Sequence, residues 1–194
     1  MPEQSTFADI DGTPRLTDRL FFAIFPDKAN AIRIAQLTHQ LRAQLGLLGK
    51  PLAENRLHVT LQYLGDHSGL PQELITRAIQ AAATVEMPAF EIVFNHILSF
   101  SRKRHNRPLV LCGDEGVIAI ALFQRQLGNA LQRLGLGRWV APIYTPHLTL
   151  LYDDRCITTQ AVDEISWIAR EFVLVHSLLG QSQHVPLARW PLYI

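Results

Sequence analysis

Residues 56–66 read RLHVTLQYLGD, and residues 147–155 read HLTLLYDDR. Each segment is an apolar run in which a histidine stands two positions before a threonine. Alternate side chains of a β-strand point to opposite faces, so the histidine and its threonine share one face, about 6–7 Å apart. The two segments therefore predict two strands of the same design, apolar toward a core and polar toward solvent.

The four polar residues of these segments are the candidate site. They are His58 and Thr60 in the first segment and His147 and Thr149 in the second. A single His-x-Thr triplet is close to what chance gives in a chain with eight histidines. Two copies inside apolar strands at equivalent places are much rarer, so we interpret them as functional rather than structural.

A second pair of similar segments indicates that a longer unit is repeated. Residues 90–100, FEIVFNHILSF, are followed later by the similar residues 171–180, EFVLVHSLLG. Two copies of one unit commonly pack about a pseudo-twofold axis, so this repeat predicts that equivalent strands face each other across a cleft. The hydrophobic periodicity predicts these elements: strands over 19–26, 56–66, 90–100, 108–113, 146–153, 171–180 and 184–192, helices over 27–45, 71–85 and 115–135, and a polar loop over 154–164.

The bulk composition limits the function classes. The chain has 194 residues, 48% of them hydrophobic, which suits one sizeable core. We expect a flexible N-terminal tail over residues 1–18 and a single bilobal domain over residues 19–194. The formal net charge of +1 excludes a broad electrostatic surface for nucleic acid, although local RNA contacts stay open. We expect no signal peptide and no membrane span, hence a cytoplasmic protein, which we take to be a monomer with no obligate protein partner.

Two histidines suit acid–base chemistry because their ordinary pKa lies near 6.5. Across a phosphodiester, one ring takes a proton from water while the other gives a proton to the leaving oxygen. The hydroxyls of Thr60 and Thr149 can donate hydrogen bonds to the non-bridging oxygens. We expect no metal and no cofactor, since neither the histidines nor Cys112 and Cys156 have the spacing of metal ligands.

The paired HVTL (58–61) and HLTL (147–150) resemble the signature of the two-histidine (2H) phosphoesterase superfamily, and within it the RNA 2′,3′-cyclic phosphodiesterase or 2′-5′ RNA ligase-like family. Supporting features are RLFFAIFP (19–26) and the closing PLARWPL (186–192). The resemblance implies an α+β fold: a bilobal duplicated unit with two antiparallel sheets facing a central cleft and helices on the outside. It further implies hydrolysis of a ribose 2′,3′-cyclic phosphate, on an RNA end or a small nucleotide, to a 2′-phosphomonoester. It also implies that His58 is the proton donor, that His147 is the proton acceptor and that both threonines bind the phosphate.

One departure concerns an arginine. Many members of the family carry one just after the second motif, where this chain has Leu151 and Tyr152, and Arg155 follows only later. This departure weakens the case for RNA ends in particular. Two other functions stay open: 2′-5′ ligation of a 2′,3′-cyclic phosphate to a 5′-hydroxyl end, and non-catalytic binding of RNA ends. A metal-dependent hydrolase is a further alternative, which insensitivity to EDTA would remove.

Several further residues are candidates for substrate contacts. Strand alternation puts Gln62 and Asp153 on the same face as the histidines. Phe22 and Phe25 are candidates for stacking on a base, although core packing explains them more simply. The basic run 102–107 is a candidate for steering RNA, and a solvated turn explains it equally well. His96, His105, His176 and His184 lack the His-x-Thr context, so we interpret them as structural or surface residues; His184 is the exception to watch, because the closing strands of such a fold border the cleft.

Overall fold

A computed structural model describes residues 15–101 and 104–193 of the chain. The predicted tail lies mostly outside these residues, and the first strand begins at Asp18. The elements follow in this order: β1 (Asp18–Ile24), α1 (Lys28–Gln44), β2 (Val59–His67), α2 (Gln72–Ala82), β3 (Phe90–Ser99), β4 (Arg107–Cys112), α3 (Ile118–Arg133), β5 (Leu148–Asp153), β6 (Gln160–Ala169), β7 (Glu171–Leu178) and β8 (Gln183–Pro191). The α+β class and the three predicted helices are confirmed.

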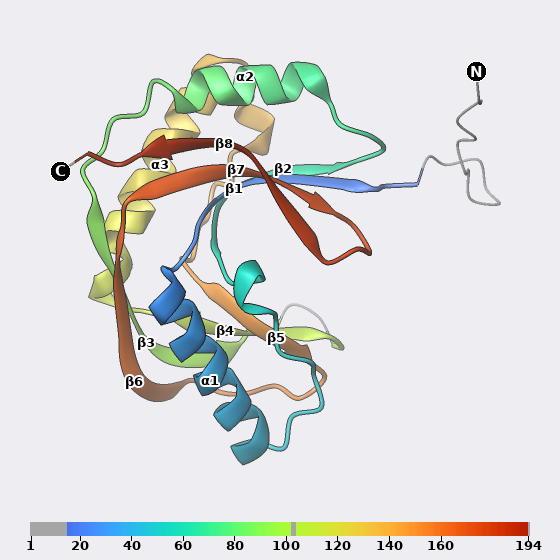
Figure 1. The fold of residues 1–194 in the computed structure, drawn as a ribbon, viewed down its shortest axis with the longest axis vertical. Helices are drawn as coiled ribbons and strands as arrows, with labels where there is room; N and C mark the ends of the chain where they lie inside the picture. The colour runs from blue at the N-terminus through green and yellow to red at the C-terminus, as the bar shows by residue number, and fades with distance from the viewer. Residues whose placement is uncertain (1–14, 102–103, 194) are drawn as a thin grey trace.

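The strands form one sheet rather than the two that the sequence suggested. Its order is β6-β3-β4-β5-β2-β1-β7-β8, and all neighbouring pairs are antiparallel. The join between β2 and β5 rests on a single residue pair, Val59 with Leu148. We call β2-β1-β7-β8 the first half-sheet and β5-β4-β3-β6 the second half-sheet; Figure 1 shows them in the upper and lower parts of the molecule. The two half-sheets therefore diverge from the point where the two His-x-Thr segments meet.

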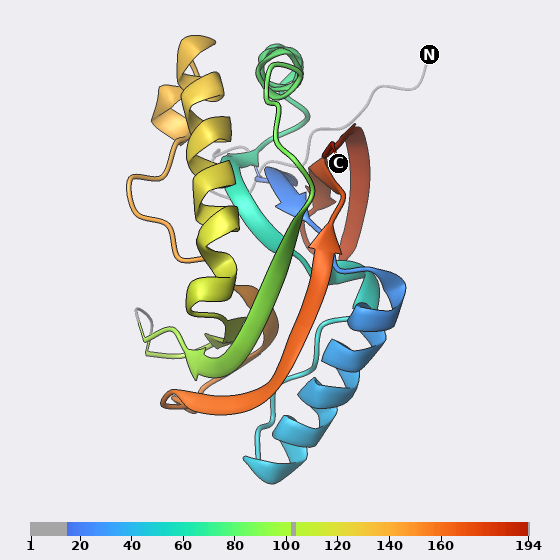
Figure 2. The ribbon, with the colours of Figure 1, turned by 90° about the vertical axis from the view of Figure 1, so that its left-hand side faces the viewer.

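The helices connect one half-sheet to the other. Helix α1 follows β1 but packs against β5 and β6, while α3 packs against β2 and β3 and also contacts α2. In Figure 2, α3 and α1 lie on the two sides of the curved strands β3 and β6. Helix α1 begins at the N-cap Asp27, whose carboxylate accepts a hydrogen bond from the Asn30 amide at 2.9 Å. Within the described segments, no helix combines the length and apolar character needed to cross a membrane.

Strand β6 is an element that the sequence analysis did not predict. Its first five residues were assigned to a polar loop, but Gln160–Ala169 pairs with β3 along most of its length. It lies at the edge of the sheet, and its first five residues are exposed or partly exposed, ahead of the alternating buried residues Ile165, Trp167 and Ala169. An edge strand needs only a short apolar face, so its periodicity is weak.

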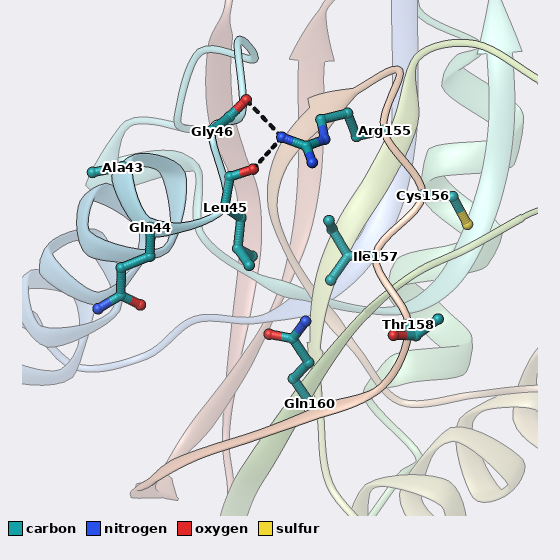
Figure 3. A pocket seen from close by; sticks show the side chains of 9 residues that line it. All are labelled: Ala43, Gln44, Leu45, Gly46, Arg155, Cys156, Ile157, Thr158 and Gln160. Atoms are coloured by element: carbon teal, nitrogen blue, oxygen red, sulfur yellow. Dashed lines mark hydrogen bonds between the residues drawn. The ribbon is translucent and has the colours of Figure 1, made fainter.

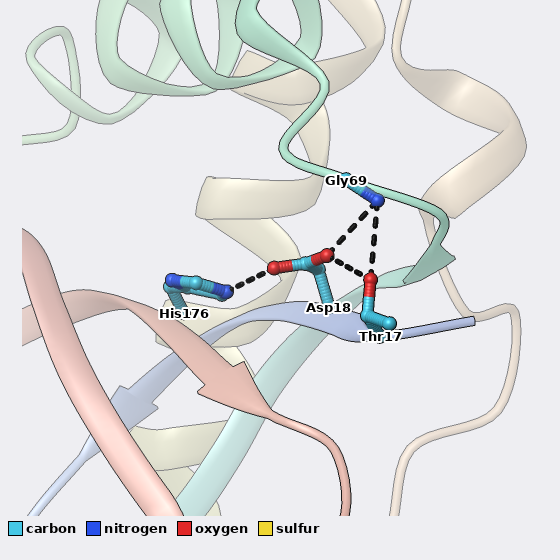
Figure 4. Close-up of polar contacts among 4 residues, drawn as sticks. All are labelled: Thr17, Asp18, Gly69 and His176. Carbon is cyan, nitrogen blue, oxygen red and sulfur yellow. Dashed lines mark hydrogen bonds and ion pairs between the residues drawn. The ribbon is translucent and has the colours of Figure 1, made fainter. Parts of the chain in front are cut away.

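A buried hydrogen bond between side chains joins β1 to β7. The His176 ring lies 2.6 Å from a carboxylate oxygen of Asp18, and both side chains are buried. The other carboxylate oxygen of Asp18 accepts hydrogen bonds from Thr17 and from the Gly69 amide, as Figure 4 shows. All polar groups of this carboxylate are thereby satisfied inside the protein. His176 therefore has the structural role that its sequence context predicted.

Candidate active site

The join between β2 and β5 brings the two motifs together. Val59 is paired with Leu148, and each is the first residue of its strand. His58 and Thr60 flank Val59, and His147 and Thr149 flank Leu148, so this one pair brings the two motifs side by side. The four predicted residues thus form a compact group at the centre of the sheet.

Both histidines are held by the same backbone contact. Nδ1 of His58 lies 2.6 Å from the carbonyl oxygen of Arg56, and Nδ1 of His147 lies 2.8 Å from that of Thr145. A carbonyl oxygen can only accept, so Nδ1 donates its proton in each ring. In the neutral ring, Nε2 is then the unprotonated nitrogen that is free to accept a proton or, once charged, to donate one. The two rings therefore have matched tautomers.

The open face of the first half-sheet is apolar around His58. Phe21, Ala23, Val173 and Val175 form a small buried cluster, separate from the main core, with Phe25 packed against it. The Phe21 ring stacks on the His58 ring with centroids 4.8 Å apart, and Phe25 lies 5.8 Å away. Phe22 instead belongs to the main core, so only Phe25 of the two predicted phenylalanines is near the site. Phe21 was missed, although it alternates with Ala23 and Phe25 along the strand.

Burial changes the protonation of both rings. The pKa of His58 is lowered to about 4, mainly by burial; the Arg56 carbonyl opposes this effect, and the positive charges of Arg56 and His147 add to it. Burial also lowers the pKa of His147, against the raising effect of the Thr145 carbonyl. The Coulombic effect of His147 on His58 is a sign that the two rings are near each other. Both rings are therefore neutral at pH 7 in the free protein.

His184 is a third histidine at the site. It lies on β8, its ring meets the His58 ring edge-on at 5.2 Å, and it meets Phe21 at 5.5 Å. Burial, followed by the charges of His58, Arg56 and Arg19, lowers its pKa to about 4. The expectation that a closing strand brings His184 to the cleft side is borne out by these contacts.

Gln62 does not lie beside Thr60 as strand alternation predicted. Leu61 is an extra residue in the ladder, because Ala23 pairs with Thr60 and the next residue back, Phe22, pairs with Gln62. This β-bulge turns Gln62 into the core, where it is 1% exposed and its amide donates to the Gln124 carbonyl of α3 at 3.1 Å. Leu150 forms the same bulge in β5.

Asp153 is likewise displaced from the predicted face. Its carboxylate accepts hydrogen bonds from the backbone amides of Leu48, Gly49 and Arg155, at 2.7, 2.7 and 2.9 Å. These bonds fix the loop after α1 and lower the pKa of the carboxyl despite its burial. Asp153 is thus a structural residue.

Arg155 likewise lies away from the histidines, at the end of α1. Its guanidinium donates to the carbonyls of Leu45 and Gly46 at the end of α1, as Figure 3 shows. A cation at a helix C-terminus satisfies free carbonyls and stabilises the helix dipole. The arginine that follows the second motif therefore belongs to a surface cavity lined by Arg155, Cys156 and the end of α1, apart from the histidines.

The described residues contain no group of three or more histidine, cysteine, aspartate or glutamate side chains arranged to hold a metal ion. The predicted basic run lies partly outside the described residues. Within it, the side chain of Arg107 donates to the Asp154 carbonyl, and His105 lies 3.5 Å from the Asp154 carboxylate.

Comparison with known proteins gives a consistent result. Residues 25–179 match the 2′-5′ RNA ligase superfamily. The RNA 2′,3′-cyclic phosphodiesterase of Escherichia coli K12 is 29% identical over 183 residues, which cover 90% of this chain and 96% of that protein. The crystal structure of E. coli LigT complexed with 3′-AMP superposes with a TM-score of 0.71 at 26% identity, covering 91% of this chain and 98% of that one. A crystal structure of a phosphoesterase, 24% identical, gives a TM-score of 0.72 and covers 91% of this chain and 99% of that one.

Proposed function

Because the chain belongs to the 2′-5′ RNA ligase superfamily, we propose that it hydrolyses a ribose 2′,3′-cyclic phosphate to a 2′-phosphomonoester, with His58 and His147 as acid and base. Family membership and the E. coli relative support phosphoesterase activity in general. The substrate is an RNA end or a small cyclic nucleotide, in keeping with a LigT structure that holds 3′-AMP. The proposal requires neither a metal ion nor a cofactor.

The proposed step uses the free Nε2 atom of each ring. His147 accepts a proton from water as the water oxygen bonds to phosphorus, and the bond from phosphorus to O3′ breaks. Protonated His58 gives its Nε2 proton to O3′, so the products are a 3′-hydroxyl and a 2′-phosphate. Thr60 and Thr149 donate hydrogen bonds to the non-bridging oxygens, where negative charge gathers in the transition state. Proton exchange with solvent then restores the starting pair.

The low pKa of His58 fits a proton donor only when substrate is bound. The cyclic phosphate is an anion, and an anion within a few ångströms favours the charged form of a histidine. Binding of the phosphate is therefore expected to raise the pKa of His58, so that this ring is protonated for the reaction.

The observation that carries this proposal is the pairing of Val59 with Leu148, which brings both His-x-Thr motifs to one point of the sheet. The test is incubation with adenosine 2′,3′-cyclic phosphate in the presence of EDTA, with the product identified by phosphorus NMR. We expect adenosine 2′-phosphate, formed at a rate that EDTA does not change. A 3′-phosphate product would contradict the assigned leaving oxygen, and loss of activity in EDTA would reject the metal-independent mechanism.

The second candidate is ligation, in which a 5′-hydroxyl takes the place of water. One observation favours it: a cavity of about 510 Å³ lies beside His147, between Phe100, Ile143 and Tyr144. This cavity leaves room for an alcohol on the side of the proposed base. Adding an oligonucleotide with a 5′-hydroxyl to the assay tests this candidate, because ligation predicts a 2′-5′ linked product at the expense of the 2′-phosphate. Binding without either product would instead support a non-catalytic RNA-end protein.

A further inference from the structure

The segment that leads from α3 into β5 contains a half-buried tyrosine, Tyr144. Residues 140–147 form neither helix nor strand before Leu148, and Ile143 beside the tyrosine is 78% exposed. Cavities of about 510 Å³ and 390 Å³ adjoin the segment, and Tyr144 lines both of them while packing against the main core. The segment therefore has little regular structure or packing of its own to fix its position.

The hydroxyl of Tyr144 bonds to the first motif. It donates a hydrogen bond to the backbone carbonyl oxygen of Thr60 at 2.9 Å. Burial raises the pKa of Tyr144, so the hydroxyl keeps its proton and acts as a donor throughout the neutral range. This bond thus runs from the segment before the second His-x-Thr motif to the backbone of the first.

The join between the two motif strands gives this bond its importance. The ladder between β2 and β5 consists of one pair, Val59 with Leu148. A single pair fixes one point between two strands and leaves their relative orientation free to vary. The bond from Tyr144 to Thr60 supplies a second point, just past Val59 on β2 and four residues before Leu148. Two points of attachment fix the orientation that one point leaves open.

The two catalytic rings depend on this bond to different degrees. Nδ1 of His147 donates to the carbonyl of Thr145, which is the residue next to Tyr144. Nδ1 of His58 donates instead to the carbonyl of Arg56, which ends a short 3₁₀ turn and is held there by its own amide bond to Ala53 at 2.8 Å. The backbone acceptor of His58 is therefore fixed by local structure, whereas that of His147 lies in an irregular segment.

We propose that Tyr144 is a positioning residue whose hydroxyl, bonded to Thr60, fixes the Thr145 carbonyl and through it the ring of His147. This inference rests on the proposed function, in which Nε2 of His147 accepts a proton from water. A reacting group that is misplaced by about 1 Å lowers a rate by as much as about 10²-fold. Tyr144 thereby acts on the chemical step without touching the substrate phosphate.

The kinetic test is Tyr144→Phe, which removes the hydroxyl and keeps the ring between the two cavities. We expect kcat for adenosine 2′,3′-cyclic phosphate to fall roughly 10- to 100-fold, with KM changed by less than about threefold, because the lost bond acts on the transition state. The control Tyr152→Phe removes a hydroxyl from an exposed tyrosine of β5 and should change neither constant. An unchanged kcat in Tyr144→Phe, or an equal fall in Tyr152→Phe, would overturn the inference.

Nitrogen NMR of the imidazole rings supplies a readout that does not need activity. Above neutral pH, both His58 and His147 of the wild type should be protonated on Nδ1 alone. In Tyr144→Phe, His147 should become a mixture of the two tautomers, while His58 should keep its signal and show that the fold is intact. A His147 signal identical to that of the wild type would reject the inference whatever the rate.

The two experiments separate this inference from the proposed function. A wild-type protein that does not hydrolyse the cyclic phosphate would count against the proposed function, and the NMR comparison then decides the role of Tyr144. A change of tautomer confined to His147 would support that role in this case too, and unchanged signals of both rings would reject it.

Discussion

His58 and His147 precede paired strands and make the same backbone hydrogen bond, yet their surroundings differ. Phe21, Phe25 and His184 all have rings within 6 Å of His58. Over the described residues, His147 has one such neighbour, Phe100, at 4.9 Å. Burial lowers both pKa values, and that of His58 falls to about 4. A repeated motif therefore sets the tautomer of each ring, whereas the neighbouring strands set its environment.

The two strands also differ just beyond their His-x-Thr motifs. After the matched bulges at Leu61 and Leu150, the next residue turns into the core in both strands, as Gln62 in β2 and as Leu151 in β5. The backbone geometry of the two halves is thus alike, while the first half-sheet fills the equivalent place with an amide that reaches α3. Variants at matched positions of the two halves test how far the two motifs are equivalent.

The largest expected effect comes from the histidines themselves. His58→Ala and His147→Ala should each lower kcat for adenosine 2′,3′-cyclic phosphate by roughly 10²–10⁴-fold, the range for losing a general acid or base. The exposed His39→Ala should leave kcat unchanged and controls for the loss of a histidine as such. An active His147→Ala protein would reject the two-histidine mechanism.

The threonines should come next. Thr60→Val and Thr149→Val remove one hydroxyl each at similar volume, and we expect kcat to fall by about 10²-fold in both, as for the loss of one transition-state donor. Thr60→Ser and Thr149→Ser keep the hydroxyl and should retain most of the rate. If only one of the two valine variants is slow, the phosphate is not held symmetrically and the equivalence of the two motifs fails.

The pH dependence tests the difference in environment. Catalysis needs one charged and one neutral ring, and burial lowers both pKa values below 6.5 in the free protein. The kcat/KM profile should therefore be bell-shaped with its maximum below pH 6.5, and should fall about tenfold per pH unit well above it. Initial rates with adenosine 2′,3′-cyclic phosphate from pH 4 to pH 9 measure this profile.

Matched substitutions of the aromatic rings beside the two histidines then distinguish the environment of His58 from that of His147. Phe21→Leu opens the surroundings of His58, which raises its pKa and should move the profile to higher pH. Phe100→Leu should move the profile less, because His147 has fewer ring neighbours in the described residues. An optimum above pH 7.5 in the wild type, or equal shifts in the two variants, would contradict the contrast between the rings.

The smallest effect on activity is expected at Gln62. Gln62→Leu copies the residue at the equivalent position of β5 and removes the hydrogen bond to Gln124 of α3. We expect kcat/KM to stay within about twofold and the free energy of unfolding to fall by about 0.5–1.5 kcal/mol, measured by urea denaturation. A large loss of activity at unchanged stability would return Gln62 to the substrate-binding residues.

The features that depend on local alternation could be predicted from the amino-acid sequence. The strands with His58 and His147, the shared face of each histidine and its threonine, and the three helices all follow from the spacing of apolar residues along the chain. The family could be recognised from the same two segments, because two His-x-Thr triplets in apolar strands are rare.

Only the tertiary structure decided which side chains meet. The bulges at Leu61 and Leu150 reverse the alternation that placed Gln62 and Asp153, and a bulge depends on the partner strand rather than on the local sequence. Arg155 is diverted to the end of α1, and His184 reaches His58 from a strand more than 120 residues away. These contacts join segments distant along the chain, so local periodicity carries no signal for them.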